Sequence, residues 1–422
     1  MTGQAQRRWS ARSLGAPALL LAVVLPVLVL VEVRPALGER RAPWPGHPEG
    51  FTLPAWLPGD CPFYRATARS LLREGDLDLR DDVAWEVLRP EGQVALGARG
   101  EWYPKHPILL AVLALPLYAA LGDGGLLLFN LLQLAALDVL LLLLARRYAG
   151  EGAALATALA FALFTLLRPA AANFSPDVLS TALVVGGTLA LLGGRPLMGG
   201  ALFGLAVAAR WTNLGLLLVA AVWIGATGGA LPLERFAIGA APALVLLGAL
   251  NLHMFGSPLT TPYDRVVGGF PGGTPVLEAS HRTFFDRPFL AGLWEQLSDG
   301  RLGLFRSAPP VLLAPLGFVL IFRRARAEAA LLAGLCAVQL ATFAPYRQWA
   351  AASYGHRFLL SVVALCAAPV AALASRYTKT PRKNPSATGA DSAQAQAASA
   401  TSSASGASRS SATEGSSSDS AR

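Results

Sequence analysis

The segment "LLLFNLLQLAALDVLLLLLA", residues 126–145, has only three polar side chains among its twenty residues. An α-helix rises about 1.5 Å per residue, so a helix of this length crosses the roughly 30 Å hydrocarbon core of a bilayer. Comparable apolar runs recur along the 422-residue chain, which is 54% hydrophobic and 14% charged. The mean hydropathy of +0.47 exceeds what a water-soluble core requires, and it predicts an all-α, polytopic membrane protein.

The apolar runs predict about ten membrane spans. They lie at residues 16–33, 126–145, 153–168, 178–193, 197–210, 213–229, 236–254, 308–322, 328–345 and 358–374. A further apolar segment, 107–121, would reach only about 22 Å as a helix and is interrupted by Pro116. We expect this segment to lie in the membrane interface.

The arginines support this topology, because counting 107–121 as a span would invert every later loop. Without it, the cytoplasmic segments hold the basic N-terminus, Arg146, Arg147, Arg195, Arg235, residues 323–326 and residues 376–383. The short outer loops hold only Arg168, Arg210, Arg347 and Arg357. We therefore predict cytoplasmic termini and two long outer loops, about 34–125 and 255–307.

The two ends of the chain differ from its middle. Arg7, Arg8 and Arg12 precede the first apolar run, and "ALGE" at 36–39 offers a signal-peptide cleavage site. An uncleaved first helix is preferred, because the run is long for a signal core. Residues 376–422, with 13 serines between 386 and 420, predict a disordered cytoplasmic tail after a transmembrane domain at 1–375.

The composition also argues against several kinds of site. The net charge of +9 comes from arginines scattered beside apolar runs, which is not the basic stripe of a nucleic-acid-binding protein. Three cysteines, Cys61, Cys336 and Cys366, cannot form a disulfide framework. The five histidines are dispersed and form no zinc signature. We expect no cofactor, although a divalent ion held by Asp60, Asp177 or a histidine stays open.

The first long outer loop contains a charged, helix-like stretch, "GDCPFYRATARSLLREGDLDLRDD", at 59–82. Its helical spacing separates an apolar face (Tyr64, Ala68, Leu71 and Leu72) from a basic face (Arg65, Arg69 and Arg73). We expect a helix lying on the membrane with its apolar side in lipid. Asp60 precedes Pro62 near the helix start, where backbone N–H groups are expected to hold its carboxylate.

This stretch, followed by "GEWYPKHPILLAVLALPLYAALG" at 100–122, resembles the first extracytoplasmic loop of the glycosyltransferase C superfamily. The match looks closest to its bacterial family 39-like branch, related to protein O-mannosyltransferases and aminoarabinose transferases. Further matching pieces extend the resemblance over about 14–375: "NFSPDVLSTALVV" (173–185), "GALFGLAVAARWTN" (200–213), "FGSPLTTPY" (255–263), "GRLGLFRSAPPVLLAPLGF" (300–318) and "WAAASYGHRFLL" (349–360).

The resemblance implies a multi-pass enzyme of the inner membrane that uses no nucleotide. Such an enzyme moves a sugar from a polyprenyl-phosphate donor in the membrane lipid to a hydroxyl of an extracytoplasmic glycan, lipid or protein. A loop Asp is catalytic in these enzymes, so Asp60 is the catalytic candidate here. Cys61 stands where the family commonly has a second acid, so a non-catalytic relative acting as a scaffold stays open. A transporter or flippase for a lipid-linked or small polar solute is the other alternative.

Further polar residues near the outer surface are candidates for binding the substrates. They are Lys105, His106, Asp177, Arg210, Tyr354 and Arg357. Cations suit a departing phosphate, and an arginine can bind it bidentately. Four of them also have a structural interpretation: Lys105 and Arg210 as cations reaching the interface, His106 as a structural or solvated side chain and Asp177 as a helix cap.

Two expectations concern how these groups are arranged. Asp60, Lys105, Asp177 and Arg357 should converge around one outer-facing cavity continuous with lipid. Within 126–145, the polar residues Asn130, Gln133 and Asp138 should hydrogen-bond neighbouring helices.

Overall fold

The computed structural model describes residues 15–37, 57, 59–86, 88–278, 284–349 and 356–377. Contacts divide the chain into two units, Met1–Arg376 and Tyr377–Arg422, and the first unit is described here. Tyr354 and the predicted tail beyond residue 377 lie outside the described residues.

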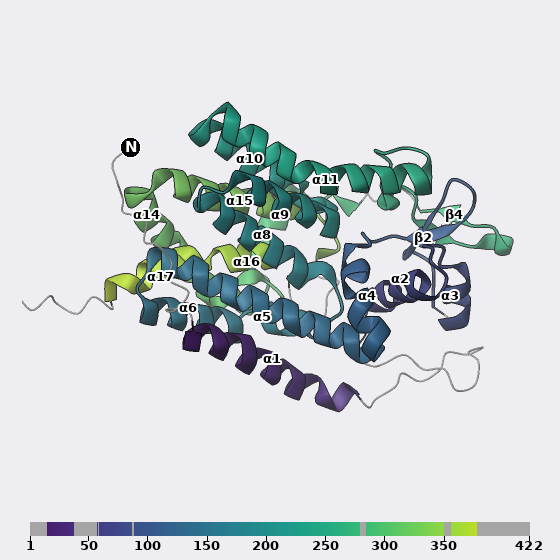
Figure 1. Ribbon diagram of the computed structural model, residues 1–422, viewed down its shortest axis with the longest axis horizontal. Coiled ribbons are helices and arrows are strands. Elements are labelled where there is room, and N and C mark those ends of the chain that lie inside the picture. Colours follow the sequence, from purple (N-terminus) through teal and green to yellow (C-terminus); the bar gives the residue numbers. More distant parts are fainter. Residues whose placement is uncertain are drawn as a thin grey trace, which may run out of the picture. The chain divides into compact units, whose positions relative to one another are not determined.

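The described part is helical (Figure 1). The longer helices are α1 (Gly15–Leu37), α2 (Cys61–Arg73), α4 (Leu109–Leu121), α5 (Asp123–Tyr148), α6 (Glu151–Leu163), α8 (Pro176–Leu192), α9 (Pro196–Ala209), α10 (Leu214–Gly228), α11 (Ala230–Phe255), α14 (Ala314–Arg324), α15 (Arg326–Phe343) and α17 (Ala367–Tyr377). Shorter helices are α3 (Arg80–Glu86), α7 (Leu167–Ala171), α12 (Phe289–Ser298), α13 (Leu304–Ser307) and α16 (Leu360–Leu365).

Short 3₁₀ helices and strands complete the description. The 3₁₀ helices are η2 (Trp211–Asn213), η3 (Pro262–Asp264), η4 (Pro271–Gly273), η6 (Pro309–Leu313) and η8 (Arg357–Leu359). The strands are β1 (Val94–Leu96), β2 (Trp102–Pro104), β3 (Val267–Gly269) and β4 (Val276–Leu277).

The predicted fold class, a polytopic helical membrane protein, is confirmed. Among the described residues, six helical stretches are long and apolar enough to cross a membrane: Gly15–Arg34, Asp123–Tyr148, Trp211–Gly228, Ala230–Phe255, Arg326–Phe343 and Arg357–Tyr377. Four shorter apolar helices, α4, α6, α8 and α9, accompany them. Each of the ten predicted spans contains a helix, whereas the sidedness of the loops stays a prediction.

Two predicted spans are broken where proline removes a backbone donor. The span at 308–322 begins as the 3₁₀ helix η6 and becomes α14 only at Ala314. The span at 358–374 divides at Cys366 into α16 and α17, with Pro369 in the first turn of α17. Proline has no N–H for the bond to the residue four positions earlier, so a continuous α-helix is interrupted at both places.

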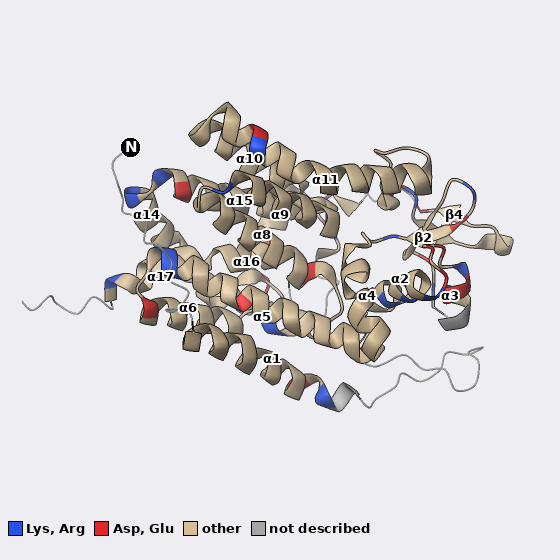
Figure 2. Cartoon of the chain, in the orientation of Figure 1, with Lys and Arg blue, Asp and Glu red and all other residues tan. Residues whose placement is uncertain are grey.

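Helix α5 lies inside the bundle and packs against α1, α4, α6 and α8. The core is built from leucine and alanine, as the apolar sequence requires, and few charged residues lie within it (Figure 2). Helices α9 and α11 also pack closely. Helix α8 packs against both α9 and α16, and these contacts bring the ends of α8 and α9 and the segment before α16 together, where the candidate site forms.

The two predicted outer loops pack together through backbone pairing. Strands β1 and β2 form an antiparallel hairpin, and Ala95 of this hairpin bridges to Val266 in the second loop. Val267 joins a small core with Phe63 and Val94. The second loop therefore forms part of the wall around α2.

Helix α2 differs from its prediction, because it lies within protein rather than against lipid. Its residues from Cys61 to Ser70 are all buried, and Tyr64 and Ala68 belong to the main apolar core. Two of the three arginines are buried too: Arg65 Nε lies 2.6 Å from Asp123 Oδ1, and Arg69 Nη1 lies 2.5 Å from Asp82 Oδ1. Buried guanidinium groups require such partners, so most of the basic face of α2 is internal and only Arg73, at its end, is exposed.

Candidate active site

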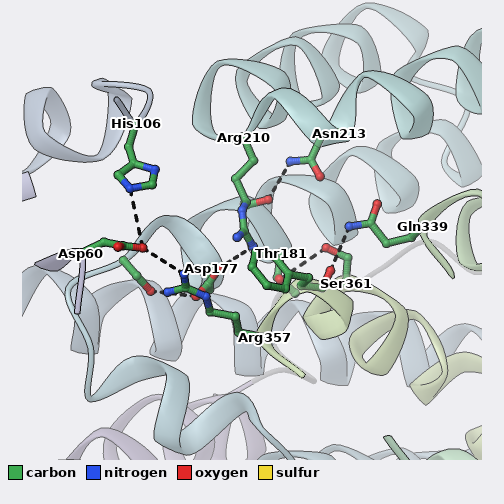
Figure 3. A network of polar contacts seen from close by, with 12 residues as sticks. Asp60, His106, Asp177, Thr181, Arg210, Asn213, Gln339, Arg357 and Ser361 are labelled. Atoms are coloured by element: carbon green, nitrogen blue, oxygen red, sulfur yellow. Dashed lines mark hydrogen bonds and ion pairs between the residues drawn. The ribbon is translucent and has the colours of Figure 1, made fainter. Parts of the chain in front are cut away.

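Asp60 lies immediately before α2, after Gly59, whose φ of +58° favours glycine. The expectation that backbone N–H groups hold its carboxylate is wrong, since its side chain makes no capping hydrogen bond. Instead, Asp60 Oδ2 accepts a hydrogen bond of 2.9 Å from Arg357 Nη2. The same oxygen lies 3.6 Å from His106 Nε2, slightly beyond hydrogen-bond length. The carboxylate thus faces two side chains distant in sequence (Figure 3).

His106 lies between β2 and α4, and its ring makes one contact through a face and another through an edge. The ring stacks on Tyr64, with centroids 5.1 Å apart and an interplanar angle of 23°. On the far edge, Nδ1 lies 3.2 Å from the hydroxyl of Tyr263 in η3. A solvated histidine would lack these contacts, so that alternative is wrong for His106, whereas a structural role of the ring agrees with them.

Lys105 is buried beside His106, with 8% of its surface exposed. Its Nζ donates to the carbonyl oxygen of Gly92, just before β1. The side chain therefore does not reach toward the interface, as the alternative interpretation required. Lys105 lies close enough to Asp60 for the two charges to influence each other.

A second ion pair joins the helices next to Asp60. Asp177, in the first turn of α8, lies 2.5 Å from Arg210, which ends α9, and it also accepts a 2.9 Å hydrogen bond from Ser175. The guanidinium groups of Arg210 and Arg357 both lie over the ring of Phe358, 5.0 and 5.1 Å from its centroid. Asp177 therefore does more than cap α8. Arg210 likewise does more than extend its charge toward the membrane interface, because it pairs with Asp177.

A layer of polar contacts supports the two ion pairs from inside the bundle (Figure 3). Asn213 donates to Ser180 Oγ at 2.7 Å, which links η2 to α8. Gln339 of α15 donates to the carbonyl of Phe358 at 3.0 Å. The Phe358 backbone is thus held in place, and with it the ring that lies beneath both arginines.

The electrostatic environment keeps Asp60 ionised. Burial alone would raise the pKa of its carboxyl, but attraction to His106, Arg357 and Lys105 outweighs burial and holds this pKa well below its usual range. Burial lowers the pKa of His106 and of Lys105, although Asp60 opposes both shifts. Burial also raises the pKa values of Tyr64 and Tyr263, so both phenols stay protonated.

Cys61, which occupies the second acidic position of the resembled motif, is buried next to Asp60. Burial and the negative charge of Asp60 raise the pKa of its thiol. A protonated thiol carries no negative charge at neutral pH, so Cys61 does not replace a carboxylate. Asp60 is left as the carboxylate of this motif.

Asp60, Lys105, Asp177 and Arg357 lie in one cluster, whereas the outer-facing cavity expected around them stays a prediction. A cavity of about 20 Å³ lies beside His106, with Trp211 and Asn251 also in its wall. This volume holds about one water molecule. Among the described residues, the group of three acidic, histidine or cysteine side chains close enough together to hold a metal ion is Glu74, Asp81 and Asp82, which does not include Asp60.

The polar residues within α5 partly follow their prediction. Asn130 donates to the carbonyl oxygens of Ala171 and Asn173, at 3.3 and 2.5 Å. Gln133 and Asp138 are buried and make no side-chain hydrogen bond with any described residue, so their predicted bonds to other helices are absent there. An apolar run predicts that a polar residue within it is buried. Whether that residue finds a hydrogen-bond partner depends on how the helices pack.

Sequence reasoning missed Tyr64, Tyr263 and Phe358 as members of this cluster. Tyr263 ends "FGSPLTTPY" and Phe358 follows Arg357, so both lay inside motifs already recognised. An apolar or aromatic residue carries no sign of which side chain it will contact.

Comparison with known proteins gives one structural match. No protein-family model and no curated protein sequence matches the chain. The chain is similar to the crystal structure of ArnT from Cupriavidus metallidurans bound to undecaprenyl phosphate, with 15% sequence identity and a TM-score of 0.48. The alignment covers 88% of this chain and 62% of ArnT, so the chain spans less than two thirds of the length of that protein. With so low a score, we base the function on the contacts of this chain alone.

Proposed function

We propose that the protein transfers a sugar from a polyprenyl-phosphate donor to an acceptor hydroxyl on the extracytoplasmic side of the inner membrane. The observation that carries this proposal is the position of the Asp60 carboxylate between Arg357 and His106, next to the Arg210–Asp177 pair. In this proposal Asp60 is catalytic. The substrate-binding residues are Lys105, His106, Asp177, Arg210, Tyr354 and Arg357.

The chemistry of a lipid-linked donor explains why such a cluster would lie at the ends of helices. The polyprenyl tail stays in the bilayer, so its phosphate and sugar can react only at the membrane surface. As the bond between sugar and phosphate breaks, negative charge grows on the phosphate and must be stabilised by cations. Arg357, Arg210 and Lys105 supply three cations beside the two carboxylates of Asp60 and Asp177.

The two arginines are already oriented for this task. Their positions over the Phe358 ring restrict both guanidinium groups, and each already binds carboxylate oxygen atoms. We propose that the donor phosphate replaces part of the pairing that Asp60 and Asp177 now provide. Asp60 would then be close to both the phosphate and the acceptor hydroxyl.

Asp60→Asn tests this role directly. The purified protein is reconstituted with a radiolabelled polyprenyl-phosphate sugar, and sugar release is measured by the appearance of free polyprenyl phosphate. We expect the variant to lose about 100-fold or more in rate, the size typical of removing a group that stabilises charge in the transition state. Asp81→Asn, the same change at an exposed position of α3, is the control and should retain the native rate.

Two outcomes would contradict the proposal in different ways. Native protein that binds the donor without releasing sugar would exclude the enzyme and leave a scaffold. An Asp60→Asn variant that releases sugar at the native rate would show that the protein has the activity but that Asp60 takes no part in the reaction.

A transporter or flippase is the second candidate function, because Asp138 is wholly buried within α5 and has no hydrogen-bond partner among the described residues. Ionisable groups inside membrane helices often mark a transport path. Movement of a fluorescent polyprenyl-phosphate sugar across vesicles, abolished by Asp138→Asn and unaffected by Asp60→Asn, would favour this alternative.

A further inference from the structure

His106 has one ring nitrogen that is engaged and one that is available. Nδ1 lies 3.2 Å from the Tyr263 hydroxyl, while Nε2 is buried and makes no hydrogen bond with any described residue. Stacking on Tyr64 determines the plane of the ring and aims Nε2 toward Asp60. His106 also borders the small cavity between the second outer loop and α11.

Asp60 is poorly suited to take a proton by itself. Its carboxylate accepts a hydrogen bond from Arg357 at 2.9 Å, and nearby positive charge holds its pKa well below the usual range. A general base is most effective when its pKa lies near the working pH. Asp60 is therefore a stable anion and a weak base.

His106 has the complementary properties. Burial is the largest cause of its lowered pKa, with Lys105 and Arg357 acting in the same direction and Asp60 in the opposite one. The tyrosines that contact it, Tyr64 and Tyr263, stay protonated at neutral pH. The imidazole is thus neutral at pH 7, and if Nδ1–H donates to Tyr263, Nε2 carries the lone pair.

We propose that His106 Nε2 accepts the proton of the acceptor hydroxyl, with Asp60 stabilising the imidazolium that forms. This inference rests on the proposed sugar transfer. The acceptor oxygen forms a bond to the sugar carbon, and the bond from that carbon to the phosphate oxygen breaks, its electron pair leaving with the phosphate. The hydroxyl proton moves to Nε2 and is later released to water.

The separation of 3.6 Å between Nε2 and Asp60 Oδ2 fits this order of events. In the tautomer with Nδ1–H toward Tyr263, Nε2 and the carboxylate oxygen share no proton, so no hydrogen bond draws the two atoms together. Once Nε2 is protonated, the same two atoms attract each other and form a charged pair at the moment when the reaction needs it. Asp60 is then required for activity without itself receiving the proton.

The test is the pH dependence of kcat/KM in the reconstituted assay, for native protein and His106→Gln. The native rate should be constant above the pKa of His106 and fall tenfold per pH unit below it, because protonated His106 cannot act as a base. His106→Gln should lose about 100-fold or more in kcat/KM, and the fall in rate at acidic pH should disappear from its profile. His253→Gln, the same change at an exposed position near the end of α11, should behave as the native chain.

Asp60→Asn distinguishes the role of Asp60 from that of His106. Without the anion, His106 is harder to protonate, so the acidic limb of the residual activity should move to lower pH. If His106→Gln fails to fold, Tyr263→Phe keeps the imidazole but frees Nδ1, and we expect about tenfold lower kcat with a displaced limb.

Native activity that persists in His106→Gln with the same pH profile overturns this inference and leaves the proposed function standing. Absence of sugar transfer by the native chain overturns both. An unchanged profile in Tyr263→Phe also contradicts the inference.

Discussion

At the scale of single residues, buried polar groups determine how the outer part of the protein is organised. Asp60 and Arg357 are 297 positions apart and still form a direct hydrogen bond. His356, the neighbour of Arg357, is completely buried and stacks on Trp349, with ring centroids 4.9 Å apart. Its two ring nitrogens make no hydrogen bond with any described residue. His356 therefore acts as an aromatic packing group in its neutral form.

Stability should fall on acidification because of His356. Burial lowers its pKa to about 3, below the value of about 6.5 in an unfolded chain. A group with a lowered folded pKa contributes stability above the unfolded pKa, and this is lost as the pH falls from about 6.5 toward 3. At about 1.4 kcal/mol per pH unit the loss reaches roughly 5 kcal/mol.

His356→Phe keeps the stacking and removes the titration, so its melting temperature in detergent should depend less on pH between 7 and 4. His253→Phe, at an exposed position, is the matched control. Parallel pH curves for the native chain and His356→Phe would contradict this account.

At the scale of helices, glycine allows the close packing of α9 against α11. A Cβ added at Gly200 would lie 1.9 Å from the Phe236 carbonyl oxygen, and one at Gly239 would lie 2.1 Å from that of Leu197. Atoms cannot approach this closely, so any side chain there must push the helices apart. Small residues allow helix backbones to approach in membranes, where no hydrophobic effect drives helices together.

Gly200→Ala should therefore destabilise the protein by about 1–3 kcal/mol, the usual cost of overpacking. Gly124→Ala is the control, because a Cβ there meets nothing within 4 Å, and it should be neutral or stabilising by up to about 1 kcal/mol. Thermal unfolding in one detergent measures both. Equal effects of the two substitutions would show that helix propensity, and not contact between α9 and α11, decides the result.

At the scale of the whole molecule, the site needs both long outer loops on one side of the membrane. Their backbones pair directly, as Gly92 N–H donates to the Val267 carbonyl at 2.7 Å and Leu96 N–H to that of Arg265 at 2.8 Å. If α4 does not span, this assembly faces the extracytoplasmic side and the loops holding Arg195 and Arg235 face the cytoplasm.

Cysteine labelling tests this topology, since the native cysteines are all buried. In whole cells, a membrane-impermeant maleimide should label Glu91→Cys, whereas Arg235→Cys should react only after permeabilisation; both positions are exposed. Labelling of Arg235→Cys in intact cells, with Glu91→Cys protected, would place the candidate site in the cytoplasm and end the proposed reaction.

The helices and the main candidates were predictable because their signals are local. Each predicted span contains a helix, and the family-like motifs contain Asp60, Asp177, Arg210 and Arg357. The expected capping of Asp60 and the lipid-facing side of α2 were wrong for one reason. Both were inferred from neighbours in sequence, whereas Arg357 and Asp123, the partners of Asp60 and Arg65, come from distant segments.

A bundle of apolar helices can be predicted from the amino-acid sequence, because the length of an apolar run and the positions of proline act within one segment. The pairing of charges, Asp60 with Arg357 and His106 and Asp177 with Arg210, is visible only in the folded chain. A buried charge must find an opposite charge or a hydrogen bond. Which one it finds depends on how helices far apart in the chain pack.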